Sequence, residues 1–444
     1  MISYAVHRFF CFMMTYQQTV EYLYSRTPVF EHVGASAYKE GLSNTLALDA
    51  HFGHPHRQYR TIHVAGTNGK GSCSHTLAAM LQAQGYRVGL YTSPHLVDFR
   101  ERIRVNGQMI SRQRVVDFVH DERSFFEPLH PSFFELTTAL AFLYFAEQHV
   151  DVAVIEVGLG GRLDCTNIIT PLLSVITNIS FDHTQFLGNT LALIAAEKAG
   201  IVKPGVPVLI GENRPETRSV FTVHAQEAGA SIVFADDEPE VMSSTADLQH
   251  GGRIYQTRHF GVLKGELGGD YQQQNTNTVL KAVSLLRRQG LQLSDENVRR
   301  GLASVTDMTG LAGRWQRIHE HPAAICDTGH NEGGWHYLSQ QIAAQPCHQL
   351  RIVFGMVDDK DVDTVMTLLP KQAVYYWTQA SSKRAFPATE IAIRGQHHGL
   401  QGVVCPNVYK AYCQALADAD VADFIFVGGS SYVVADLLSA FREL

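Results

Sequence analysis

A glycine-rich loop with a single lysine is the feature of this sequence best suited to chemistry. The residues Gly66-Thr67-Asn68-Gly69-Lys70-Gly71-Ser72 stand between a predicted strand and a predicted helix. Such a turn directs backbone N–H groups and the helix N-terminus at phosphate oxygens, and the lysine adds a positive charge. The loop departs from the standard Walker sequence, which needs glycine where Val64 stands and a hydroxyl where Gly71 stands. A plain glycine turn is the alternative, and we predict phosphate binding.

Oxygen-bearing side chains follow two other predicted strands. Ser93 lies in the segment Thr92-Ser93-Pro94-His95-Leu96, and Glu156 lies near the end of the apolar run 150–157. Parallel sheets bind ligands at the carboxyl ends of their strands, and Mg²⁺ prefers oxygen ligands. A buried carboxylate is costly unless it binds a cation or accepts hydrogen bonds. The alternatives are an ordinary Ser-Pro loop opening at Ser93 and a hydrogen-bonded core glutamate at Glu156.

Three further positions carry weaker signals. A histidine such as His183, after the next strand, is more often structural than a ligand, because magnesium prefers oxygen. Lys198, near the end of a predicted helix, has the alternative role of a surface lysine favoured by the helix dipole. The segment Asp327-Thr328-Gly329-His330-Asn331 could close over a nucleotide, or it could simply cap a helix.

The elements that must position these residues follow a regular alternation of buried strand, glycine turn and helix. This alternation is typical of parallel α/β proteins. Strands are expected at residues 61–65, 86–92, 150–157 and 172–178, and helices at 72–84, 133–149, 191–199 and 272–289.

A breaker-rich segment, residues 306–313, divides the chain. We expect residues 1–308 to form a P-loop-type domain with a mostly parallel sheet, and residues 309–444 to form a smaller Rossmann-like α/β domain. The second domain should contain strands at 323–326, 351–354, 373–377, 402–405 and 423–427. No G-x-G-x-x-G follows these strands, so the second domain is not an obvious dinucleotide fold.

Composition excludes several classes of protein. The 444 residues include 36 Lys and Arg against 43 Asp and Glu, which gives a net charge of −7 and argues against nucleic-acid and anionic-membrane partners. No apolar run is long enough for a spanning helix. Seven cysteines without a CxxC pair indicate a reducing compartment, so we expect a cytoplasmic protein. We also expect residues 1–13 to be an extension ahead of a true start at Met13 or Met14.

In chain order, these motifs resemble the dihydrofolate synthase/folylpolyglutamate synthase family, relatives of the Mur peptide ligases. The resemblance covers nearly the whole chain. Its motifs are Pro28-Val29-Phe30, the segment 37–45, 66–72, 93–96, 156–164, Asp182-His183, 197–201, Gln272-x-x-Asn275, Gly313-Arg314, 327–331, Phe354-Gly355 and Asp359-Lys360-Asp361. Two departures are Ala312, where proline usually precedes Gly-Arg, and Thr328-Gly329, which replaces the small pair usual before His-Asn.

The resemblance implies a role for each matching position. ATP would be bound by Gly66, Thr67, Asn68, Gly69, Lys70, Gly71, Ser72, Asn275, Arg314 and Asp327. Two Mg²⁺ ions would be held by Ser93, Glu156 and His183. The catalytic residues would be Lys70, His183, Lys198 and His330, with a CO₂-derived carbamate on Lys198. The pterin site would include Phe134, Leu163 and Asp164.

The implied reaction is ATP-dependent ligation of L-glutamate to dihydropteroate and to reduced folates through an acyl phosphate, by a monomeric enzyme. A folylpolyglutamate synthase without the first activity is the alternative within the family. A Mur-type peptide ligase would need a nucleotide-sugar peptide site, which the sequence does not suggest. A P-loop NTPase switch would need a Walker B-type strand end, which is absent in register.

Overall fold

The computed structural model describes residues 13–26, 41–247, 251–358 and 360–443. An eight-stranded sheet of order β4-β3-β2-β5-β1-β6-β7-β8 forms the centre of the first part of the chain. The six strands from β2 to β8 in this order run parallel, and β3 and β4 form an antiparallel edge. The strands are β1 (Arg60–Ala65), β2 (Val88–Tyr91), β3 (Ile103–Val105), β4 (Gln108–Met109), β5 (Val152–Glu156), β6 (Leu173–Ile176), β7 (Val208–Ile210) and β8 (Ile232–Phe234).

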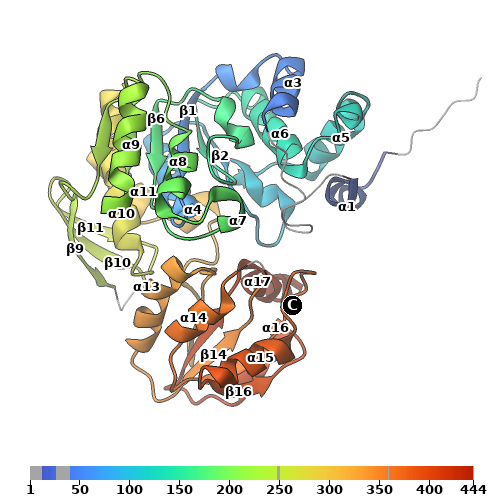
Figure 1. The fold of residues 1–444 in the computed structure, drawn as a ribbon, viewed down its shortest axis with the longest axis vertical. Helices are drawn as coiled ribbons and strands as arrows, with labels where there is room; N and C mark the ends of the chain where they lie inside the picture. The colour runs from blue at the N-terminus through green and yellow to red at the C-terminus, as the bar shows by residue number, and fades with distance from the viewer. Residues whose placement is uncertain (1–12, 27–40, 248–250, 359, 444) are drawn as a thin grey trace, which may run out of the picture.

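Helices cover both faces of this sheet (Figure 1). The neighbouring residues Val154 and Ile155 of β5 point to opposite faces, because side chains alternate along a strand. Val154 packs in a core with Leu77 of α4, whereas Ile155 packs in a second core with Phe142 of α6. The helices are α1 (Tyr16–Arg26), α3 (Ser43–His51), α4 (Lys70–Gln84), α5 (Arg112–Phe126), α6 (Phe133–Glu147), α7 (Thr184–Leu187), α8 (Leu191–Ala199), α9 (Pro215–Glu227), α10 (Gln272–Arg288), α11 (Asp295–Leu302) and α12 (Val305–Thr309).

A small antiparallel sheet, which the sequence reasoning did not predict, precedes α10. Its strands are β9 (Val241–Ala246), β10 (Arg253–Thr257) and β11 (Val262–Gly265), in the order β11-β10-β9. Tyr255 and Leu263 from this sheet are buried in the same core as α4 and α10, so the sheet extends one face of the first part of the chain.

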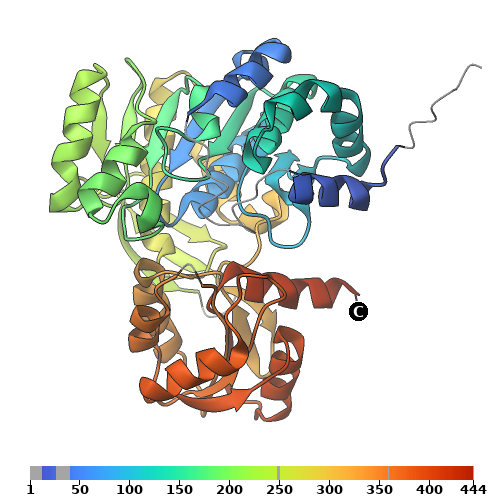
Figure 2. The same ribbon diagram turned by 45° about the vertical axis from the view of Figure 1, so that its right-hand side comes forward.

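The last part of the chain forms a six-stranded sheet of order β12-β13-β17-β14-β15-β16. Five of its strands are parallel and β12 is an antiparallel edge strand. The elements are β12 (Gln316–His319), β13 (Ala323–Cys326), α13 (Glu332–Ala343), β14 (Leu350–Phe354), α14 (Val362–Leu368), β15 (Val374–Trp377), α15 (Ala388–His397), β16 (Gln401–Val404), α16 (Val408–Ala417), β17 (Phe424–Gly428) and α17 (Ser431–Glu443). Figures 1 and 2 show this orange-to-red part below the first part, with α13 and α17 nearest to it.

The predicted fold class is confirmed by these two α/β parts. The predicted strand at 323–326 has the observed bounds, and the predicted helix at 191–199 also has the observed bounds. The predicted linker at 306–313 is partly wrong, because its first residues lie in α12. The change of sheet falls between α12 and β12, and the boundary at residues 308–309 stays a prediction.

Some predictions fall outside the described residues. These are Pro28–Phe30, residues 37–40 of the N-terminal motif, Asp359, and most of the expected extension 1–13. Within the described ranges, no helix has both the length and the apolar character that crossing a bilayer requires.

Candidate active site

The glycine-rich loop connects β1 to α4, as predicted. Gly66 and Gly69 adopt positive φ angles of 145° and 81°, which favour glycine. A Cβ atom on Gly66 would lie 1.9 Å from Oγ1 of Thr177, and one on Gly69 would lie 2.2 Å from Oδ1 of Asn275. Glycine is therefore required at both positions by the close approach of β6 and α10 to the loop.

Lys70 is the first residue of α4, and its side chain folds back over the loop. Its Nζ donates hydrogen bonds to the carbonyl oxygens of Gly66 (2.9 Å) and Thr67 (3.1 Å). Burial lowers the pKa of Lys70, and the carboxylates of Glu156 and Asp182 partly offset this effect. A lysine charge at a helix N-terminus is a suitable partner for phosphate oxygens.

Asn68 connects the loop to the C-terminal part of the chain. Its side-chain amide exchanges two hydrogen bonds with the amide of Asn331, at 3.1 and 3.0 Å, and donates a third to Oγ of Ser180 (3.2 Å). Asn331 is the N-cap of α13 and accepts the N–H of Gly334. Asn331 therefore caps its helix, as the alternative proposed, and also contacts the phosphate loop.

Glu156 ends β5 and is 3% exposed. Its Oε2 accepts the backbone N–H of Ser93 at 3.0 Å. Its Oε1 faces the loop, 3.9 Å from the position that a Cβ atom on Gly71 would occupy. Burial raises the pKa of Glu156, and the charge of Lys70 lowers it again. The structure thus brings Ser93, Glu156 and the phosphate loop together at one edge of the sheet.

His183 precedes α7 in the left-handed region, with φ of 49°. Its Nε2 lies 3.8 Å from Oδ1 of Asp182. Asp182 also forms an ion pair with Lys360 (2.6 Å) and accepts a hydrogen bond from Asn331 (2.9 Å), so this carboxylate is a meeting point of both parts of the chain. Burial alone would raise the pKa of Asp182, but His330 and Lys360 hold it well below its usual range.

Lys198 is 4% exposed, and its Nζ donates a hydrogen bond to the carbonyl oxygen of Gly66 at 3.0 Å. The alternative of an ordinary surface lysine is therefore wrong. Burial lowers the pKa of Lys198 to about 7, and the neighbouring charge of Lys70 adds to this effect. A substantial fraction of Lys198 is consequently an uncharged amine near neutral pH.

Two of the residues expected at the nucleotide, Asn275 and Arg314, lie next to glycines of the loop. Asn275 donates to Gln272 (2.9 Å), which in turn donates to Oγ of Ser72 (3.2 Å). Nη2 of Arg314 lies 3.5 Å from the position of a Cβ on Gly71. The side chains of Asn275 and Arg314 therefore lie against the phosphate loop from two different parts of the chain.

Asp327 directly follows β13 and is 2% exposed. Its Oδ2 accepts the hydroxyl of Tyr271 (2.5 Å) and the backbone N–H of Trp315 (2.7 Å), and its Oδ1 accepts the N–H of Gly329 (2.8 Å). Burial raises the pKa of Asp327, and the charge of Arg314 lowers it. Asp327 thus anchors the segment that carries Arg314.

The residues expected at the pterin site surround the loop that follows β5. The ring of Phe134 packs on Gly158, where a Cβ would lie 2.4 Å from the ring, and Leu163 is half-buried near the end of this loop. Oδ2 of Asp164 accepts the N–H groups of Gly158 (3.0 Å) and Leu159 (2.9 Å). Asp164 therefore shapes the loop, and contact of these three residues with a substrate stays a prediction.

His330 follows β13 in the C-terminal part of the chain. Its Nδ1 is 3.0 Å from the carbonyl oxygen of Thr328, and its Nε2 is 3.4 Å from Oδ2 of Asp182. Its side chain is 34% exposed. His330 therefore contacts Asp182 and helps to keep the pKa of this carboxyl group low. Its catalytic role stays a prediction.

The chemistry of the donors is suited to a divalent cation. In the parts of the chain that the structure describes, no three His, Cys, Asp or Glu side chains converge as a ready metal site. Glu156 supplies a carboxylate beside the phosphate loop, with Ser93 next to it, and a phosphate oxygen would be a natural further ligand.

Sequence reasoning missed several residues near this site. Asp182 and Lys360 were included in motifs but not assigned roles, although each stands beside a predicted site residue or motif. Asn178, Glu212 and Tyr337 also form hydrogen bonds that lead to the loop. No local signal identifies Glu212 or Tyr337, because each lies in an ordinary polar stretch.

Comparisons with known proteins agree with this geometry. Residues 64–283 match the Mur ligase middle domain, and residues 313–431 match the Mur ligase glutamate ligase domain. The chain is 37% identical over 343 residues to the dihydrofolate synthase/folylpolyglutamate synthase of Bacillus subtilis, covering 74% of this chain and 79% of the relative.

Solved structures resemble it over almost their entire length. Escherichia coli FolC in complex with DHPP and ADP is 30% identical, with a TM-score of 0.81 over 97% of this chain and 98% of that structure. A bifunctional folylpolyglutamate synthase/dihydrofolate synthase with Mn, AMPPNP and L-glutamate bound is 30% identical, with a TM-score of 0.79 over the same shares.

Proposed function

This chain belongs to the dihydrofolate synthase/folylpolyglutamate synthase family of Mur ligases, and from this membership we propose how its site forms an amide bond. The enzyme is an ATP-dependent ligase that joins L-glutamate to the carboxyl group of dihydropteroate and to that of reduced folates. The observation that carries the proposal is the position of Lys70, Glu156 and Arg314 around one glycine-rich loop.

The reaction begins with activation of a carboxylate, which is a poor acylating agent. A carboxylate oxygen attacks the γ-phosphorus of ATP, and the bond to the β-phosphate oxygen breaks to release ADP. Lys70 and the backbone N–H groups at the start of α4 bind the phosphates and neutralise the charge that develops during transfer. The protein therefore contributes mainly positioning and electrostatic stabilisation.

In the second step, the amine of L-glutamate attacks the carbonyl carbon of the acyl phosphate. The tetrahedral intermediate releases inorganic phosphate, and the amine loses a proton as the amide forms. Contacts such as Asn68 with Asn331 hold the two parts of the chain together over the site. This closure would exclude water, which would otherwise hydrolyse the acyl phosphate.

Divalent metal and nucleotide are both used in the family, as the complex with Mn and AMPPNP indicates. We assign two Mg²⁺ ions to Ser93, Glu156 and His183, where their charge would be shared with the phosphate oxygens. Support comes from the carboxylate of Glu156 at the loop and from its hydrogen bond with the backbone N–H of Ser93. Binding of Arg314, Asn275 and Asp327 to the nucleotide is supported by their positions against the same loop.

We also assign a carbamate to Lys198. Only an uncharged amine reacts with CO₂, and burial gives Lys198 a pKa of about 7, so that this form is available. The carbamate would exchange a positive charge for a negative one beside the metals.

The absence of disulfides among the six described cysteines is consistent with the expected cytoplasmic location.

Product analysis tests the proposed reaction. The protein is incubated with ATP, L-glutamate and either dihydropteroate or a reduced folate, and amide products and ADP are measured. We expect amide from both acceptors. Amide from the folate alone would show that the protein is a folylpolyglutamate synthase without the first activity. ADP release without any acceptor would show that it is an ATPase and not a ligase.

A further inference from the structure

Glu212 follows β7 and lies between the phosphate loop and helix α13. Its Oε1 accepts a hydrogen bond from Nδ2 of Asn178 (3.0 Å), and its Oε2 accepts the hydroxyl of Tyr337 (3.2 Å). Its backbone N–H donates to the carbonyl oxygen of Thr177 (2.8 Å), which fixes the residue beside β6. Glu212 therefore contacts both parts of the chain without belonging to the predicted site.

Asn178 is the direct support of the phosphate loop. Its Oδ1 accepts the backbone N–H of Asn68 (2.8 Å), and its carbonyl oxygen accepts the backbone N–H of Thr67 (3.0 Å). A side-chain amide has one accepting end and one donating end. Because the carboxylate of Glu212 accepts only from Nδ2, it turns Oδ1 of Asn178 toward the loop.

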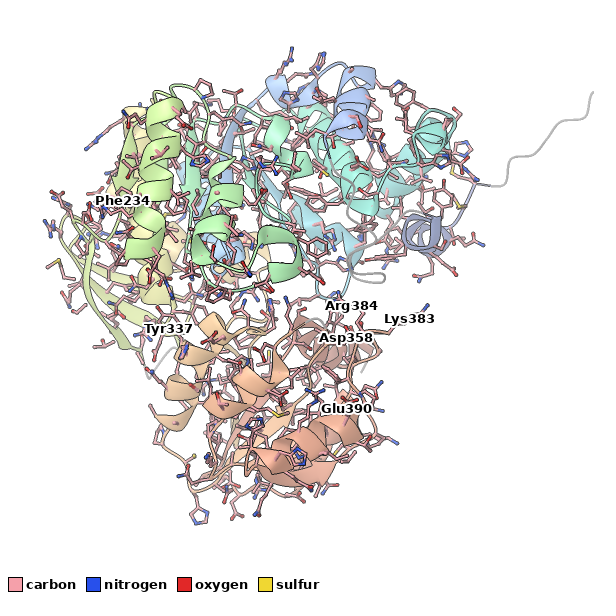
Figure 3. The ribbon with its side chains drawn as sticks, viewed as in Figure 1. Phe234, Tyr337, Asp358, Lys383, Arg384 and Glu390 are labelled. Carbon is pink, nitrogen blue, oxygen red and sulfur yellow. The ribbon has the colours of Figure 1, made fainter. Side chains whose placement is uncertain are left out.

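Tyr337 brings the C-terminal part of the chain to this network. It lies on α13, where the upper and lower parts of the molecule meet (Figure 3). Burial and the neighbouring charge of Glu212 raise the pKa of Tyr337 to about 12, so the hydroxyl remains a donor. Asn331, at the start of the same helix, contacts Asn68 directly. Helix α13 thus contacts the phosphate loop directly through Asn331 and indirectly through Tyr337, Glu212 and Asn178.

A cavity of about 360 Å³ accompanies the network at this junction. Its lining includes Asn178, Glu212, Tyr337 and Gln340. The polar groups here therefore line a cavity instead of lying in a fully packed core.

We propose that Tyr337, Glu212 and Asn178 form a relay of positioning residues through which the docking of α13 sets the geometry of the phosphate loop. None of the three residues belongs to the proposed nucleotide, metal or pterin sites, and their hydrogen bonds lead to the backbone of the phosphate loop. It orients the Asn178 amide, which in turn orients the backbone of Thr67 and Asn68. The inference rests on the proposed function only for its effect on turnover, because binding of ADP can be measured without any acceptor.

The test is a double-mutant cycle on the full chain, with ADP affinity and the KM and kcat for ATP as readouts. Loss of a hydrogen bond to a carboxylate should weaken ADP binding about tenfold in Glu212→Gln and about threefold in Tyr337→Phe. Tyr337→Phe should have no further effect in the Glu212→Gln background, because the tyrosine acts through the carboxylate. The KM for ATP should rise in both variants, while the KM for L-glutamate stays at the wild-type value.

Gln340→Ala is the matched control, since its side chain lines the same cavity on the same helix. It should leave ADP affinity unchanged. Equal effects of Tyr337→Phe in both backgrounds, or a change in the KM for L-glutamate alone, would overturn the relay. If Glu212→Gln does not fold, Asn178→Ala replaces it in the cycle with the same expectations. A wild-type protein that binds ADP but forms no amide would refute the proposed function and leave this test intact.

Discussion

The carboxyl ends of the two parallel sheets use buried polar side chains in different ways. At the first sheet, Glu156 and Lys198 are buried and Lys70 is half-buried, and each has a shifted pKa. At the second sheet, burial also raises the pKa of Asp327, but Asp327 and Asn331 accept backbone N–H groups that fix the local chain. The first edge therefore gathers titratable groups around the phosphate loop, and the second edge uses polar side chains to hold the backbone in place.

This difference follows from the cost of burying charge. A buried ion without adequate partners destabilises the fold, so groups such as Lys198 are retained for chemistry rather than for stability. Backbone hydrogen bonds to Asp327 and Asn331 stabilise their segments instead. Substitutions at the first edge should therefore remove turnover, and substitutions at the second edge should change substrate affinity and stability.

The largest effect is expected for Lys70→Ala. Loss of a charge that stabilises the transferring phosphoryl group should lower kcat by about 10³-fold or more. The measurement is ADP formation with L-glutamate and dihydropteroate. Lys264→Ala, at an exposed lysine of β11, is the control and should retain wild-type kcat. A Lys70→Ala enzyme with near wild-type turnover would remove this lysine from the mechanism.

Lys198→Met should separate function from stability. The variant should lose at least about 100-fold in kcat, because methionine cannot form the proposed carbamate, whose negative charge would lie beside the metals. In the folded protein the pKa of Lys198 is about 7, below the ordinary value of 10.5, so the free energy of unfolding decreases as the pH falls from 10.5 to 7. Methionine does not titrate, so the variant keeps this stability at low pH.

Thermal unfolding at two pH values checks the second half of that prediction. Lys198→Met should have a higher Tm than the wild type at pH 6, and the difference should shrink at pH 10. A variant that is less stable than the wild type at pH 6 would show that the charge of Lys198 is fully compensated in the fold.

Asp327→Asn tests the geometric role of the second edge. An amide cannot accept all three hydrogen bonds at Asp327, and the anchoring of the Arg314 segment should weaken. The KM for ATP should rise about tenfold, with kcat changed by less than about threefold. Steady-state kinetics measures both values. Asp420→Asn, at an exposed aspartate of the same part, should change neither, and a loss confined to kcat at Asp327 would place this residue in the chemical step.

The smallest effect is expected for Asn331→Ala. Loss of the N-cap of α13 should cost about 1 kcal/mol and lower the Tm by about 2 °C. Asn407→Ala removes the equivalent cap of α16, which also accepts an N–H three residues ahead. Both variants should lose similar stability, but Asn331→Ala alone should raise the KM for ATP, by about threefold. Equal KM values for ATP in the two variants would show that Asn331 acts only as the N-cap of α13.

Much of the fold could be predicted because its signals are local. The apolar runs of β5 and β6 predict buried strands, and glycines at 66 and 69 predict the loop between β1 and α4. The sheet β9–β11 was missed, since its strands are short, β9 alternates exposed and buried residues only weakly, and the sheet depends on contacts with α10 and α11.

By itself, the sequence determined where strands end in polar residues, and therefore which residues could face a phosphate. It did not determine that Lys198 is buried against Gly66, that Asp182 pairs with Lys360, or that Glu212 connects Asn178 to Tyr337. Those contacts join residues far apart in the chain. Only the order of the strands and the docking of the second sheet on the first bring them within hydrogen-bonding distance, and burial there sets their charge states.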